Sequence, residues 1–218
     1  MPFFLLAFPA LFSIVNPLGG AFMFLGATEA FSPNIRKELA KWIAIYSFAI
    51  IIASMYVGAY VLGFFGISIP VLRAAGGIVI AAASWRMLNA PDDEEPKTGE
   101  EVAHDLPLTR KVSRIAFYPL TMPITTGPGT ISVAVSLGTN RPRGTTAAEL
   151  LSFVGQSMLA IVLICALVYV LYRYASPLSR LIGPTGTVIV TRLSAFLLFC
   201  IGVQVFWNGA AELLATVR

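Results

Sequence analysis

Two short stretches rich in proline and glycine decide how this chain can fold. Residues 15–20 read VNPLGG and residues 125–130 read TTGPGT, and each stretch lies inside a long apolar segment. Proline cannot donate a backbone hydrogen bond and clashes with the preceding helical turn, so each stretch is expected to interrupt a helix. In hydrocarbon every freed backbone group is costly unless protein or water satisfies it. Paired interruptions of this kind indicate the binding site of a transporter.

The composition indicates an integral membrane protein. Of the 218 residues, 57% are hydrophobic and 12% are charged, about half the charged share of roughly 25% in soluble domains, and the mean hydropathy is +0.80. Uncharged runs over 115–140 and 150–172 each exceed the roughly 20 residues that cross a bilayer. We expect an all-α polytopic protein that forms one membrane domain over 1–218, with lipid as its surroundings and no nucleic-acid partner.

Hydrophobic segments alternate with short polar loops and predict six transmembrane helices. They cover residues 3–26, 40–64, 69–88, 113–138, 149–173 and 185–213. An acidic, proline-bounded linker at 90–111 divides them into repeat one (1–89) and repeat two (112–218). Each repeat begins with a broken helix, so the first and fourth helices are the interrupted ones. Three spans per repeat place the two copies in opposite orientations, which is the inverted-repeat plan of many secondary transporters.

The distribution of positive charge predicts the orientation. Ten of the 15 lysines and arginines fall near the loops after the first, third and fifth segments, and three fall on the opposite side. Because loops rich in lysine and arginine stay in the cytoplasm, the linker is expected there and both termini outside. The chain is thus predicted to be a multi-pass protein of the inner (plasma) membrane.

The interruptions supply the candidate binding groups. A helix that resumes after a proline presents unpaired amides and the positive end of its dipole, both of which attract an anion. Glycines let a ligand approach the backbone, and neighbouring side chains supply further polar groups. The predicted substrate-binding residues are Asn16, Pro17, Gly19, Gly20, Thr125, Thr126, Gly127, Pro128, Gly129 and Thr130. They suit a small amino or hydroxy acid; the alternative is a pair of ordinary proline kinks sealed by neighbouring helices.

One arginine lies near the start of the last helix of each repeat. Arg73 and Arg192 either pair with a substrate carboxylate and act in gating, or snorkel and cap helix ends in a structural role. Second-tier polar residues are Ser13, Ser132, Ser136, Ser194 and Gln204.

Acidic side chains are missing from the middle of every predicted span, and the one histidine, His104, lies in the linker. Proton relays in membranes commonly use embedded carboxylates or histidines. The alternatives are coupling to Na⁺ through carbonyls and hydroxyls, coupling to H⁺, and transport without a coupling ion. No cofactor or metal site is predicted. An intramembrane enzyme is disfavoured, since no embedded histidine, aspartate pair or Cys–His arrangement is available to activate a nucleophile.

Three motifs in order resemble the MarC family of bacterial and archaeal membrane proteins. They are the Asn-Pro-x-Gly-Gly break at 16–20, the run from Phe65 to Gly77 that contains Arg73, and the Gly-Pro-Gly-Thr break at 127–130. The resemblance spans essentially the whole chain. It implies a plasma-membrane protein whose relatives move small neutral amino acids such as glycine and alanine. The acidic linker departs from the family pattern.

The sequence therefore predicts a secondary transporter of small neutral amino acids that works by alternating access around the two broken helices. A passive channel and a non-transporting membrane adaptor are the alternatives.

Overall fold

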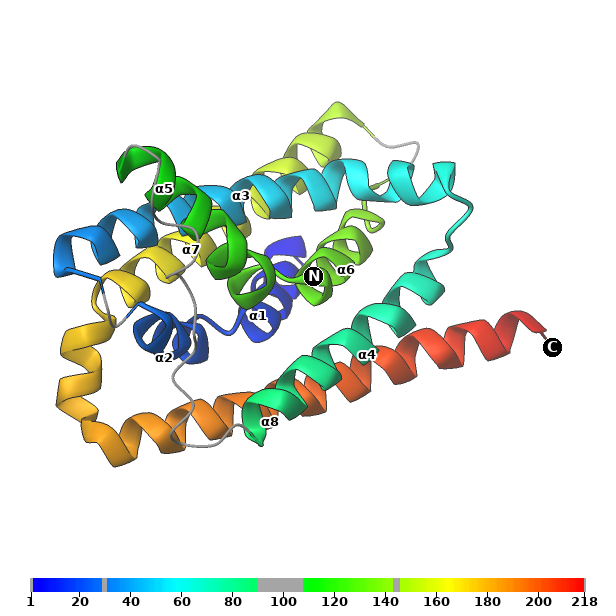
Figure 1. The fold of residues 1–218 in the computed structure, drawn as a ribbon. Coiled ribbons are helices and arrows are strands. Elements are labelled where there is room, and N and C mark those ends of the chain that lie inside the picture. Colours follow the sequence, from blue (N-terminus) through cyan, green and yellow to red (C-terminus); the bar gives the residue numbers. More distant parts are fainter. Residues whose placement is uncertain (1, 29–30, 90–107, 143–145, 218) are drawn as a thin grey trace.

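The chain folds as an all-helical bundle in a computed structural model that describes residues 2–28, 31–89, 108–142 and 146–217 (Figure 1). No strand occurs in these ranges. The elements in chain order are α1 (Phe3–Val15), α2 (Pro17–Ala27), α3 (Pro33–Phe64), α4 (Ile69–Leu88), α5 (Leu108–Ile115), the π-helical segment η1 (Ala116–Thr125), α6 (Pro128–Gly138), α7 (Ala147–Arg173) and α8 (Ala175–Val217). The acidic part of the predicted linker, 90–107, lies outside the described residues.

Five of the six predicted spans are long and apolar enough to cross a membrane. They cover Phe3–Ala27, Pro33–Phe64, Ile69–Leu88, Ala147–Arg173 and Thr185–Ala215. The fourth predicted segment is divided into α5, η1 and α6, and α6 has only 11 residues. Its division follows from prolines at 119, 123 and 128, each of which removes a backbone donor.

Several helices extend beyond the predicted segments. α3 begins at Pro33, seven residues before the expected start at 40, and α5 begins at Leu108. α8 begins at Ala175 and bends at Gly183, whose φ of 79° favours glycine because it lacks a Cβ. The straight part after this bend corresponds to the predicted sixth segment.

The helices of the N-terminal half pack mainly on those of the C-terminal half. α4 lies along α8, and α3 lies beside α7 (Figure 1). The broken helices lie between these two pairs: α2 contacts α7 and α8, whereas α6 contacts α3 and α4. α1 likewise packs on α7, as η1 packs on α3. Each half therefore completes the packing of the other.

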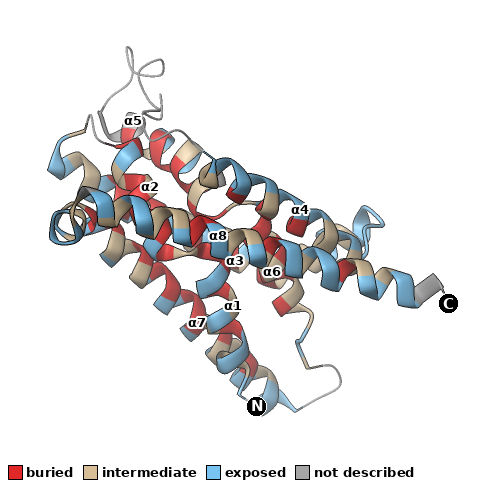
Figure 2. Ribbon diagram, turned by 90° about the horizontal axis from the view of Figure 1, so that it is seen from below, coloured by how far each residue is buried: buried red, intermediate tan, exposed pale blue. Residues whose placement is uncertain are grey.

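Burial follows this arrangement. Buried positions concentrate on the inward faces of α2, α3, α6 and α7, whereas α8 is exposed along much of its length (Figure 2). The fully buried large side chains include Leu11, Phe24, Ile43 and Tyr172. An outer face rich in exposed apolar residues is what a bilayer covers.

Candidate functional site

The first interruption lies at Asn16, between α1 and α2. Asn16 adopts a left-handed conformation (φ 45°, ψ 63°), which ends α1, and Pro17 occupies the first position of α2. Asparagine is one of the few residues that visits this conformation readily. The Asn16 Oδ1 atom accepts a hydrogen bond from the Gly19 amide at 3.3 Å. The chain itself therefore caps the N-terminus of α2.

The second interruption has a different structure. Gly127 is extended (φ −81°, ψ −176°), Pro128 takes the first position of α6, and no side chain caps this end. The amides of Gly129 and Thr130 form no hydrogen bond with another described residue. The N-terminus of α6 thus keeps its unpaired donors and its positive partial charge.

Two threonine hydroxyls bond the backbone that precedes this second interruption. Within η1, Tyr118 and Met122 leave helical geometry. The hydroxyl of Thr121 donates to the Ala116 carbonyl at 2.7 Å, and that of Thr125 donates to the Leu120 carbonyl at 2.8 Å. Both hydroxyls bond a carbonyl five residues earlier, which is the spacing of a π-helical turn, so they reinforce the distorted backbone of η1.

Two long helices hold the end of η1 in place. The Thr126 hydroxyl donates to Ser47 Oγ of α3 at 2.7 Å, and Thr126 is fully buried. Thr125 Oγ1 lies 2.9 Å from the hydroxyl of Tyr172 on α7. Thr126 was predicted to contact substrate, but in this structure its hydroxyl serves to anchor the backbone.

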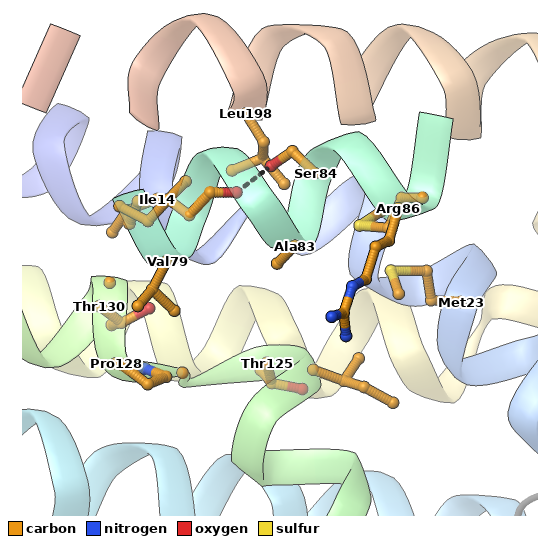
Figure 3. A pocket seen from close by; sticks show the side chains of 15 residues that line it. Ile14, Met23, Val79, Ala83, Ser84, Arg86, Thr125, Pro128, Thr130 and Leu198 are labelled. Atoms are coloured by element: carbon orange, nitrogen blue, oxygen red, sulfur yellow. Dashed lines mark hydrogen bonds between the residues drawn. The ribbon is translucent and has the colours of Figure 1, made fainter. Parts of the chain in front are cut away.

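A cavity of about 310 Å³ opens beside the second interruption (Figure 3). Five of the ten predicted binding residues line it, namely Thr125, Gly127, Pro128, Gly129 and Thr130. Its lining comprises Ile14, Met23, Val79, Ile80, Ala83, Ser84, Arg86, Met87, Ile124, Thr125, Gly127, Pro128, Gly129, Thr130 and Leu198. Thr130 is only 3% exposed, and its hydroxyl forms no hydrogen bond with another described residue. Unused donors therefore converge on one end of a mostly apolar space.

The residues of the first interruption lie outside this lining. A Cβ at Gly19 would stand 2.7 Å from Ser194 Cβ on α8, and one at Gly20 would stand 2.4 Å from the Tyr172 hydroxyl. These glycines therefore permit close helix packing, and Asn16 and Pro17 shape the turn before them. The two interruptions are still neighbours, because the Cβ position of Gly129 lies 3.6 Å from Ile14 Cδ1.

Arg86 lines the cavity but is not among the site residues predicted from sequence. Its side chain extends from α4 into the cavity, towards Thr125 and beside Met23 (Figure 3). Val79, Ala83 and Arg86 follow one another at helical spacing on the α4 face that lines the cavity. That spacing is the signal in the sequence that could have identified Arg86.

Arg73 and Arg192 lie away from the cavity lining. The guanidinium of Arg73 donates to Ser136 Oγ at 2.8 and 2.6 Å and to Glu212 Oε2 at 2.7 Å. Arg192 Nη1 donates to the Leu88 carbonyl at 2.8 Å. Each arginine thus joins one end of α4 to α8, as the structural alternative in the sequence analysis requires.

The second-tier residues serve mainly in packing. Ser132 Oγ donates to the Leu72 carbonyl at 3.1 Å, and Gln204 donates to Asn208 at 2.8 Å on the exposed face of α8. Ser13 is exposed on α1. Among the described residues, no group of three or more His, Cys, Asp or Glu side chains is placed to hold a metal ion.

Comparison with known proteins gives a consistent family match. The MarC family integral membrane protein model matches residues 1–214. The proteins named "UPF0056 inner membrane protein MarC" from Escherichia coli K12 and from Shigella flexneri are each 35% identical to this chain over 210 residues. The match covers 94% of this chain and 93% of each relative. No solved structure matches.

Proposed function

Because the chain belongs to the MarC family of integral membrane proteins, we propose that it is a secondary transporter of small neutral amino acids such as glycine and alanine. The observation that carries the proposal is the uncapped N-terminus of α6 at the wall of the cavity. The amides of Gly129 and Thr130 would receive the substrate carboxylate, and the hydroxyl of Thr130 would supply a further donor. Helix N-termini bind carboxylates through this combination of amides and dipole.

The packing of the two halves supports alternating access. α2 contacts α7 and α8 in the way that α6 contacts α3 and α4. Likewise, α1 packs on α7 of the second half and η1 packs on α3 of the first half. The α4–α8 and α3–α7 pairs each join helices that hold the same position in the two halves. An inverted repeat would produce this exchange, and in transporters such repeats rock around a central site. In this proposal the predicted orientation places both termini outside the inner membrane.

Counterflow in proteoliposomes tests the proposal. Vesicles that hold purified protein and unlabelled alanine should accumulate labelled glycine, alanine or serine, and the uptake should saturate. Runs with and without sodium or a pH gradient determine the coupling. Unsaturable flux without counterflow would indicate a passive channel instead. Deletion of residues 92–101 should leave counterflow intact, because the proposed transport machinery lies in the helices. A membrane adaptor would be favoured instead if neither the full chain nor the deletion variant transports and the deletion abolishes a signalling role.

A substitution at the cavity locates the site. A Cβ at Gly129 would lie 2.2 Å from Ile80 Cγ1, so Gly129→Val should displace the α6 N-terminus and abolish counterflow. Gly155→Val is the matched control, since no atom lies within 4 Å of the Cβ position at Gly155. Both variants should reach the membrane in normal amounts. Normal uptake by Gly129→Val would remove the site from this position.

A further inference from the structure

The described lining of the cavity includes one cationic side chain and no anionic one. Arg86 is its only charged lining residue in the part of the chain that the structure describes. Its guanidinium makes no hydrogen bond or ion pair with another described residue, in contrast to Arg73 and Arg192. The positive end of the α6 dipole adds to its charge. The electrostatic character of the cavity is therefore that of an anion site.

A role for Arg86 in capping α4 does not explain this geometry. Cations at a helix C-terminus commonly bond the last carbonyls. Here Asn89 already bonds the Trp85 carbonyl with its backbone amide at 3.1 Å and with its side chain at 2.8 Å. The Arg86 side chain instead extends into the cavity beside Met23 and Thr125 (Figure 3).

The rest of the lining defines the body of the ligand. Most of the wall is aliphatic or thioether, and it includes Ile14, Met23, Val79, Met87 and Leu198. At roughly 30 Å³ for each water-sized group, a volume of about 310 Å³ holds on the order of ten non-hydrogen atoms. A small solute with one carboxylate and an uncharged body fits this space.

We propose that Arg86, together with the amides of the α6 N-terminus, binds the carboxylate of the transported solute, and that the substrate class is therefore small aliphatic monocarboxylates, of which neutral amino acids are one group. This inference rests on the proposed transport function and adds a residue and a class to it. Among the described residues no acidic side chain lines the cavity to receive an amino group, so the proposed recognition is through the carboxylate and does not require a free amine.

Inhibition of alanine counterflow by unlabelled analogues tests the substrate class. Lactate and propionate keep the carboxylate and lack the amine, whereas alaninamide keeps the amine and lacks the carboxylate. Lactate and propionate should compete with alanine, and alaninamide should not. Inhibition by alaninamide but not by either acid would overturn the proposal.

Variants at Arg86 test the residue. Because Gln lacks the charge that strengthens a hydrogen bond to a carboxylate, Arg86→Gln should raise the KM for alanine by a factor of ten or more. It should also abolish competition by propionate, and Arg86→Lys should restore part of both. Arg114→Gln, an exposed arginine of α5, is the matched control. An unchanged KM and an unchanged inhibitor pattern in Arg86→Gln would overturn the role of Arg86 while leaving transport intact.

A binding measurement separates this inference from the transport proposal. Propionate should raise the melting temperature of the detergent-solubilised wild-type protein relative to sodium chloride of equal ionic strength, and it should not do so for Arg86→Gln. If counterflow fails altogether but this difference is present, the anion site stands and the transport proposal falls. If the two proteins respond equally to propionate, Arg86 is not the carboxylate ligand.

Discussion

The crossing of α4 and α8 provides the sharpest test of the fold. At Gly77 a Cβ would lie 2.3 Å from the backbone nitrogen of Phe206 and 2.6 Å from the Gly202 carbonyl oxygen. Both atoms belong to the backbone of α8, so no rotamer change can move them away. Ordinary van der Waals contact begins at 3.4 Å. Gly77→Ala therefore requires α4 and α8 to separate by about 1 Å. A gap of this size loses about a quarter to a half of the dispersion energy of each affected contact.

The magnitude follows from two opposing terms. Overpacking a tight contact costs about 1–3 kcal/mol, and the upper end applies here because the clash is with backbone. Alanine gains about 1 kcal/mol over glycine in helix propensity. The free energy of unfolding of Gly77→Ala should thus fall by about 2 kcal/mol. Gly155→Ala in α7 has open space at its Cβ position, so it should gain up to about 1 kcal/mol from the same propensity term.

Reversible unfolding in mixed detergent micelles, followed by circular dichroism, measures both variants. The expected difference between Gly77→Ala and Gly155→Ala is about 3 kcal/mol, and it cancels the shared propensity term. Equal stabilities would mean that α4 and α8 do not approach each other at Gly77, and the packing described here would be wrong.

Two further predictions concern the polar anchors and the orientation. Tyr172→Phe removes the hydrogen bond between Tyr172 and Thr125, whereas Thr125 keeps its bond to the Leu120 carbonyl. The free energy of unfolding should therefore fall by about 0.5–1.5 kcal/mol. A loss above about 3 kcal/mol would contradict this reading and assign a larger role to the Tyr172 hydroxyl. In a variant with Cys165 and Cys200 replaced, a membrane-impermeant maleimide added to whole cells should label Ser68→Cys but not Ser32→Cys, and the reverse pattern would invert the predicted topology.

The membrane class, the helical segments and both interruptions could be predicted from sequence. Proline and glycine act on the local backbone, and long apolar runs need no tertiary information. The extension of the second interruption through η1 was missed, although Pro119 and Pro123 gave a local signal for it. A proline distorts a helix even where every neighbouring residue is apolar.

The composition of the site was harder to predict, because it depends on which side chains remain available after packing. Asn16 and Thr126 looked equally suited to a ligand, yet one caps α2 and the other bonds Ser47. Arg86 entered the site because α4 presents that face to α6, a fact that tertiary packing alone determines. Sequence likewise gave no reason to treat the two glycine-rich breaks differently, although only one of them lies at the cavity.

The exchange of partners between the two halves has a consequence for biosynthesis. No two of the helices α1 to α4 pack extensively on each other in the described structure; their main neighbours come from residues 108–217. A ribosome that has released the first 89 residues has therefore delivered spans that lack their neighbours. The membrane must hold these spans apart until the later helices arrive, so insertion and assembly are separate events in the life of this protein.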